Sequence, residues 1–157
     1  MKLSFSTFGW DGFTWDKLCS TARECGFTGI EIHNIHEPVF SGYQNLFDPA
    51  LTNVMHRELV EMGLCIPCLD TSCNIADGGN FAKNCEEIET YINNARNLRV
   101  PYVRLGARPC GGDREEHAAV MKCLKRVVPF AKKAKVTLLI ETIGVFADSG
   151  KLSETLN

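Results

Sequence analysis

Short apolar runs alternate with amphipathic helical patterns along the whole chain of 157 residues. Strand-like runs occupy residues 3–8, 27–33, 64–69, 102–105 and 136–141, and the apolar residues between them keep helical spacing. The pattern repeats at intervals of roughly 35 residues, which is typical of right-handed βαβ units on a parallel sheet. The sequence therefore predicts an α/β domain built on five parallel strands.

Cap and breaker residues mark the ends of the expected helices. Thr14 is the expected N-cap of the first helix and Gly26 its end. Pro129 is expected to kink or end the fourth helix. The other expected helices begin at Asp48-Pro49, cover 82–98, follow Gly111-Gly112-Asp113, and open at 151–157 with Asp148 or Ser149 as N-cap.

Two architectures fit this order of elements. A doubly wound sheet of five strands would be complete at this length, whereas a (β/α)8 barrel needs about 250 residues. However, Glu31, Arg104 and Glu141 lie within or at the end of strands, and central strands of a doubly wound sheet are apolar on both faces. A barrel has an inner face where such charges can meet. The charges therefore favour parallel (β/α) units in sequential order, a partial TIM barrel of about five of its eight units.

Composition narrows the possible functions. The formal net charge of -2 gives no broad basic field, so nucleic-acid binding is disfavoured. No apolar run approaches the roughly 18 residues that span a bilayer, and no secretory signal begins the chain, so we expect no membrane partner and a cytoplasmic location.

The eight cysteines are then expected to be reduced, and Cys65 and Cys68 are expected to be structural despite their CxxC spacing. No GxGxxG or GxxxxGK[ST] loop follows the first strand to bind a nucleotide.

Several segments, in their order and spacing, resemble one family. These stretches are Gly29-Ile30-Glu31-Ile32, Leu69-Asp70-Thr71-Ser72, Pro101-Tyr102-Val103-Arg104, Thr137-Leu138-Leu139-Ile140-Glu141-Thr142 and the tail Val145-Phe146-Ala147-Asp148. Together they are similar to the N-terminal part of the xylose-isomerase-like TIM barrels, which include sugar and sugar-phosphate isomerases and epimerases. The resemblance covers nearly the whole chain. It implies that residues 1–157 form a single, C-terminally incomplete domain of that kind.

The resemblance also implies a divalent cation, manganese, magnesium, cobalt or zinc, held by a glutamate after the fifth strand and by ligands after later strands. Glu141 matches that first ligand and is the candidate catalytic residue, because the family's glutamate can also transfer a proton beside the substrate carbonyl. Many relatives carry histidine two residues later, where this chain has Ile143. Since the other ligands would come from later strands, we expect weak or no metal binding by this chain.

Three further residues are candidates for substrate binding. His33 ends the second strand, where it could contact a sugar hydroxyl or be a solvated loop histidine. Glu31 and Arg104 could contact substrate, although a buried ion pair that satisfies two interior charges is the favoured interpretation. Asp70 could orient a ligand, but Asp70-Thr71-Ser72 also suits an Asx turn, which we favour. The remaining polar or aromatic candidates are assigned packing or loop roles and are Trp10, His36, His56 and His117.

The sequence thus favours a metal-dependent sugar or sugar-phosphate isomerase or epimerase whose partner is a small sugar. An open sheet also exposes two edges, so homo-oligomers through those edges are expected. Two alternatives stay open at this point. One is a complete flavodoxin-like or receiver-like binding domain, which would have strand order 2-1-3-4-5. The other is an abasic-site endonuclease on the same barrel, which would need a multi-metal cluster.

Overall fold

The computed structural model describes residues 1–10, 12–35 and 52–156. Strands and helices alternate through these residues. The strands are β1 (Ser4–Ser6), β2 (Gly29–His33), β3 (Cys68–Asn74), β4 (Tyr102–Gly106) and β5 (Thr137–Ile140). The helices are α1 (Trp15–Glu24), α2 (Thr52–Glu61), α3 (Phe81–Leu98), α4 (Asp113–Ala134) and α5 (Ser149–Leu156). None of the helices in the described ranges is long and apolar enough to cross a bilayer.

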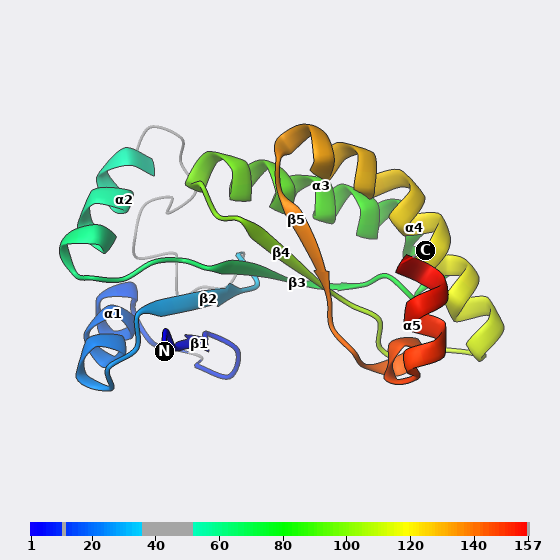
Figure 1. Cartoon of the computed structure of the whole chain (residues 1–157), viewed down its shortest axis with the longest axis horizontal. Coiled ribbons are helices and arrows are strands. Elements are labelled where there is room, and N and C mark those ends of the chain that lie inside the picture. Colours follow the sequence, from blue (N-terminus) through cyan, green and yellow to red (C-terminus); the bar gives the residue numbers. More distant parts are fainter. Residues whose placement is uncertain (11, 36–51, 157) are drawn as a thin grey trace.

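The five strands form one sheet in the order β1-β2-β3-β4-β5, and each neighbouring pair is parallel. In Figure 1 the colours follow the sheet in this order, from blue β1 to orange β5. Sequential order is the order of a (β/α) barrel, whereas a flavodoxin-like sheet has its first two strands exchanged. The partial-barrel prediction is confirmed, and the flavodoxin-like or receiver-like alternative is wrong.

The two faces of the sheet have different chemistry because side chains alternate along each strand. Ile32, Leu69 and Val103 are neighbours in the sheet register and are fully buried. Helices cover this outer face: α1 packs on β2, α3 on β3 and β4, and α4 on β5, and α3 and α4 lie side by side. The opposite, inner face carries the charged residues of the strands, so the apolar core and the charges are kept apart.

Several sequence predictions are confirmed at single residues. The Thr14 side chain accepts a hydrogen bond from the backbone N–H of Lys17 and caps α1. Gly26, which follows that helix, has a φ of 74°. Asp148 accepts from the backbone N–H groups of Gly150 and Lys151, so it is the N-cap of α5.

Other predictions need correction. The third strand covers Cys68–Asn74 rather than 64–69, so the segment expected to form an Asx turn, Asp70-Thr71-Ser72, lies inside it. Parallel pairing with β4 extends this strand despite its polar sequence. Helix α4 passes through Pro129 to Ala134, because buried residues on both sides of the proline, Val127 and Ala131, pack the helix against the core. His36 and the expected helix start at Asp48-Pro49 lie outside the described residues.

Most of the cysteines belong to the core. Cys85 and Cys123 face each other across α3 and α4 with their Sγ atoms 3.7 Å apart, whereas Cys25 is exposed at the end of α1. Burial is the main cause that raises the pKa of the Cys19, Cys68 and Cys73 thiols from the ordinary value of 9.0 to about 12. The folded state therefore binds these protons more tightly than the unfolded state.

This difference predicts a loss of stability at alkaline pH. Unfolded thiols ionise near pH 9 while the folded ones stay protonated to about pH 12, so the free energy of unfolding should fall as pH rises through this window. Urea unfolding, measured at pH 9 and again midway between pH 9 and about pH 12, gives this fall in the free energy of unfolding. It should be smaller for Cys73→Ala than for the parent chain and unchanged for Cys25→Ala, whose thiol is exposed. Equal falls in all three proteins would contradict the assignment.

Candidate functional site

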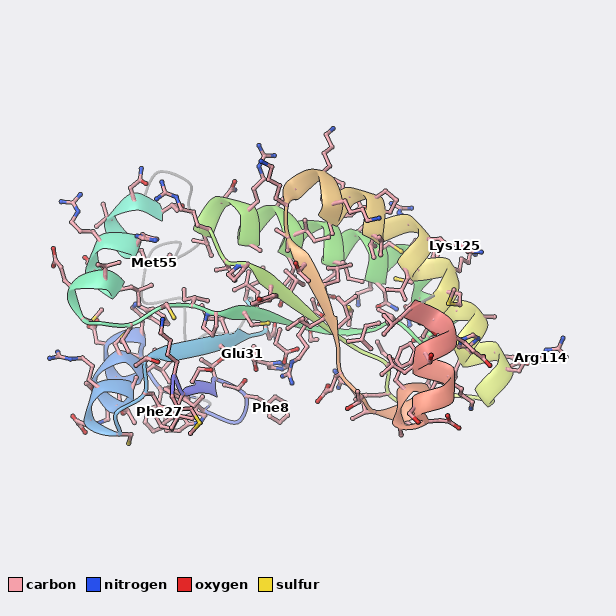
Figure 2. All side chains as sticks on the ribbon, in the orientation of Figure 1. Phe8, Phe27, Glu31, Met55, Arg114 and Lys125 are labelled. Carbon is pink, nitrogen blue, oxygen red and sulfur yellow. The ribbon has the colours of Figure 1, made fainter. Side chains whose placement is uncertain are left out.

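The four predicted site residues come together on the inner face of the sheet, near the carboxyl ends of the strands. Glu31 and His33 lie two residues apart on β2, Arg104 lies on β4, and Glu141 directly follows β5. His33, Asp70 and Arg104 are register neighbours across β2, β3 and β4, so their side chains leave the same face at the same height. Figure 2 shows Glu31 among the strands at the centre of the molecule.

The guanidinium of Arg104 is the centre of the cluster. Its Nε and Nη2 donate to the two oxygens of Asp70 at 3.1 and 2.8 Å, which is a two-bond, fork-like pairing. Nη2 also donates to Glu31 Oε1 at 3.0 Å. Nη1 lies 3.5 Å from Glu141 Oε1. One cation thus contacts carboxylates from β2, from β3 and from the end of β5.

Burial and the carboxylates act in opposite directions on this cation. Desolvation lowers the pKa of Arg104, but the hydrogen bonds to Asp70 and the charges of Asp70, Glu31 and Glu141 together raise it above its ordinary value. Arg104 therefore stays charged in the site. The favoured interpretation of Glu31 and Arg104 as an ion pair is confirmed, and the structure extends it to two more carboxylates.

Asp70 also orients His33. The ring Nδ1 of His33 donates to Asp70 Oδ2 at 2.6 Å, since an ionised carboxylate can only accept. The backbone N–H of His33 donates to Thr7 Oγ1 at 2.8 Å, and the edge of the Phe8 ring lies against the imidazole with the centroids 4.7 Å apart. Figure 2 shows the Phe8 ring projecting from the loop after β1, and it is 68% exposed. His33 is therefore held at the end of β2 by hydrogen bonds and ring packing, and it is not a solvated loop histidine.

Asp70 is the site residue that the sequence analysis assigned to a turn. Its side chain is 8% exposed and makes three short contacts, with two atoms of Arg104 and one of His33. A turn was favoured because Asp, Thr and Ser in a row compete with strand structure through local hydrogen bonds. One sequence signal points the other way: the predicted Glu31–Arg104 ion pair joins the second and fourth strands, so the strand between them can supply a further carboxylate to the same cation.

Glu141 is more open than the other carboxylates. Its side chain is 39% exposed, against 8% for Asp70, although both contact Arg104. Gly106, on the neighbouring strand, leaves room beside it, since a Cβ at that position would lie 3.8 Å from Glu141 Oε2. Glu141 and Asp70 therefore differ in their access to solvent, although both contact the same cation.

The described residues do not by themselves form the metal site that the resemblance implies. No three His, Cys, Asp or Glu side chains of the described ranges gather in a geometry that could hold a metal ion. Glu141 offers one oxygen donor toward the open side, while Glu31 and Asp70 direct oxygens to Arg104. A divalent cation needs several such donors.

The residues assigned to packing or loops have no place in the cluster. Trp10 packs its ring between Phe5 and Phe13, with centroids 5.0 and 5.1 Å away. His117 on α4 lies 3.2 Å from the hydroxyl of Thr155 on α5, and His56 is exposed on α2. These three residues contribute to the surface and to helix packing.

Parallel strands in sequential order, with helices on one face and polar groups on the other, are the arrangement of a partial (β/α) barrel. The family model described as "xylose isomerase-like TIM barrel" matches residues 19–156, so the chain belongs to that family. Solved structures that share its fold include sugar epimerases, a sugar phosphate isomerase/epimerase and a mannonate dehydratase. No curated protein matches the chain in sequence.

Three solved structures show the shared fold. The probable 3-DHS dehydratase AsbF from Bacillus anthracis superposes with a TM-score of 0.78 at 20% identity over 99% of this chain and 58% of its own. The IolI protein, solved with a zinc atom, gives 0.72 at 14% identity over 89% of this chain and 51% of its own. A D-psicose 3-epimerase, solved in the presence of D-fructose, gives 0.69 at 13% identity over 99% and 60%. The chain thus spans between half and about three fifths of these relatives' lengths.

The shared carboxylate of Asp70 predicts a large stability effect. Asp70→Asn removes the carboxylate that accepts two hydrogen bonds from Arg104 and one from His33 in a mostly buried site, and leaves Arg104 paired only with Glu31 and Glu141. The free energy of unfolding should therefore fall by about 2–3 kcal/mol. The matched control is Glu89→Gln, which breaks the more exposed ion pair with Arg126 and should cost less than about 1 kcal/mol. Urea unfolding monitored by circular dichroism compares them. Similar losses in both variants would show that the cluster is not a stabilising network.

Proposed function

We propose that this chain carries the sugar-binding and proton-transfer side of an isomerase or epimerase site. The observation that supports the proposal is the Arg104 cluster, which places an open carboxylate, Glu141, beside a fixed guanidinium on the inner face of a family barrel. Removal of a proton from a carbon next to a carbonyl needs a base and a positive group for the developing negative charge. Glu141 and Arg104 have these two chemistries within 3.5 Å of each other.

The cluster also suits a polyhydroxy substrate. Glu31, with a side chain that is 19% exposed, presents carboxylate oxygens, and Arg104, with a side chain that is 27% exposed, presents N–H donors. Because Nδ1 of His33 is held by Asp70, its Nε2 is left for a hydroxyl group. Sugar hydroxyls both donate and accept hydrogen bonds, so alternating donors and acceptors bind and orient them. We therefore assign His33, Glu31 and Arg104 to substrate binding.

In the proposed reaction Glu141 takes the proton from the carbon beside the carbonyl and returns it. Return to the neighbouring carbonyl carbon, with the hydroxyl proton moving to the former carbonyl oxygen, gives an isomer. Delivery of a proton to the opposite face of the same carbon by a second acid gives an epimer. Arg104 lies where it would stabilise the negative charge on the substrate oxygen between these steps. A divalent metal, when bound, would polarise the carbonyl. Among the residues that the structure describes, Glu141 is the ligand that we assign to such a metal.

Other properties expected from the sequence stay proposals. These are a single domain over residues 1–157 that lacks later barrel units, a cytoplasmic location, oligomers through the edge strands β1 and β5, and no nucleic-acid or membrane partner. Phosphorylation of the sugar is also a proposal at this level. No contact among the described residues favours the abasic-site endonuclease alternative.

Glu141→Gln should abolish proton exchange. The parent chain, incubated with D-fructose and manganese in deuterium oxide, should exchange hydrogen at a carbon beside the carbonyl, as read by proton NMR. Loss of the base should slow this exchange by at least about 100-fold. Glu115→Gln, at an exposed glutamate on α4, removes the same charge and should leave the rate unchanged. Equal exchange by parent chain and Glu141→Gln, or none by the parent chain, would contradict the role of Glu141.

Metal affinity gives a second test that does not depend on turnover. With one carboxylate donor, manganese should bind with a dissociation constant of about a millimolar or weaker. Titration monitored by water-proton relaxation measures it, and Glu141→Gln should remove the residual binding that Glu115→Gln retains. Tight stoichiometric binding that Glu141→Gln abolishes would show that other residues of this chain complete the metal site.

A further inference from the structure

The loop between β4 and α4 is fixed by side chains from outside it. At its start, the amide of Asn74 bonds both ways with the backbone of Arg108: Nδ2 donates to the carbonyl at 2.9 Å, and Oδ1 accepts the N–H at 2.9 Å. This reciprocal pair attaches the loop to the end of β3. The position of Arg108 is therefore set by the sheet.

A buried carboxylate fixes the other half of the loop. Glu116, on the first turns of α4, is 3% exposed and accepts the backbone N–H groups of Cys110 and Gly111 at 2.7 and 2.6 Å. Charge-assisted bonds of this kind are stronger than neutral ones. With both halves held, the loop presents Arg108 with little freedom of the backbone.

The Arg108 side chain reaches the mouth of the candidate site. Gly106 lies two residues after Arg104 on β4, so a side chain there would point to the same inner face. The Cβ position of Gly106 is 3.7 Å from Arg108 Nε and 3.8 Å from Glu141 Oε2. Arg108 and Glu141 thus approach one point of the inner face, and the absence of a side chain at Gly106 leaves that point open.

The charges around Arg104 and Arg108 differ. Arg104 contacts three carboxylates, and Arg126 on α4 pairs with Glu89. None of the ion pairs between described residues includes Arg108, whose Nη2 donates to the backbone carbonyl of Ser72 at 3.3 Å. A guanidinium has five N–H donors, so several remain for a ligand. Since the Arg104 cluster has more carboxylates than cations, an anionic group would be repelled there and attracted to Arg108.

We propose that Arg108 binds an oxyanion, a carboxylate or a phosphate, at the end of the sugar substrate. The Arg104 cluster binds the hydroxyl groups and Arg108 binds the charged end, so the preferred substrate is a sugar acid or a sugar phosphate. This inference rests on the proposed function, because it extends the same site. Guanidinium suits both oxyanions through paired hydrogen bonds.

Three six-carbon open-chain compounds of the same configuration that differ only at carbon 1 test the proposal: D-glucitol, D-gluconate and D-glucitol 1-phosphate. Each is titrated into the isotope-labelled chain and followed by amide chemical shifts. At least one anion should bind about tenfold more tightly than glucitol. Arg108→Gln should remove this gain and leave glucitol affinity unchanged, and Arg108→Lys should keep part of it. Arg114→Gln is the control, since Arg114 is exposed at the start of α4 and points outward in Figure 2.

The outcomes separate the two proposals. A gain limited to gluconate assigns a carboxylate, a gain limited to glucitol 1-phosphate assigns a phosphate, and a gain for both assigns either oxyanion. No gain for either anion, or a gain that Arg108→Gln retains, overturns the role of Arg108. Failure of glucitol to shift amides around Glu31 and Arg104 would instead contradict hydroxyl binding by the cluster. An unchanged spread of amide shifts in the free variants shows that they are folded.

Discussion

The guanidinium of Arg104 is the contact on which the inner face depends. Three carboxylates from β2, from β3 and from the end of β5 approach one another there, and they would repel without a cation between them. The planar fork of arginine can bond Asp70 with two nitrogens and still reach Glu31 and Glu141, which the single ammonium of lysine cannot do. The same contacts link strands that are not sheet neighbours. One side chain thus both stabilises the sheet and assembles the site.

The two faces of the sheet have separate roles, because one supplies the stabilising core and the other the polar groups of the site. The outer face of the strands, with Ile32, Leu69 and Val103 fully buried under helices, supplies the apolar core. The inner face supplies polar groups, and Tyr102 and Leu139 on it are about 40% exposed. Because alternate residues of one strand serve the two faces, a shift of one residue in register would exchange core and site. The register is therefore a requirement of the function as well as of the fold.

Local pattern predicted the order of elements, most helix ends and the meeting of Glu31, Arg104 and Glu141, because periodicity and strand charges are visible in sequence. It did not predict that Asp70 lies in a strand. The signals for a turn at Asp70-Thr71-Ser72 are local. The interactions that place Asp70 in a strand are the pairing of β3 with β4 and the ion pair with Arg104, and both involve residues more than 30 positions away. Pro129 shows the same limit, since packing of Val127 and Ala131 outweighs its local cost.

The contacts of the three carboxylates also argue which of them can act on a substrate. Asp70 is bonded to Arg104 and His33 and is 8% exposed, so its oxygens are occupied and enclosed. Glu31 is 19% exposed and accepts a hydrogen bond from Arg104. Glu141 is 39% exposed, lies farthest from the guanidinium at 3.5 Å, and faces the space beside Gly106. A base must reach the proton it removes, so only Glu141 combines access with a neighbouring positive charge.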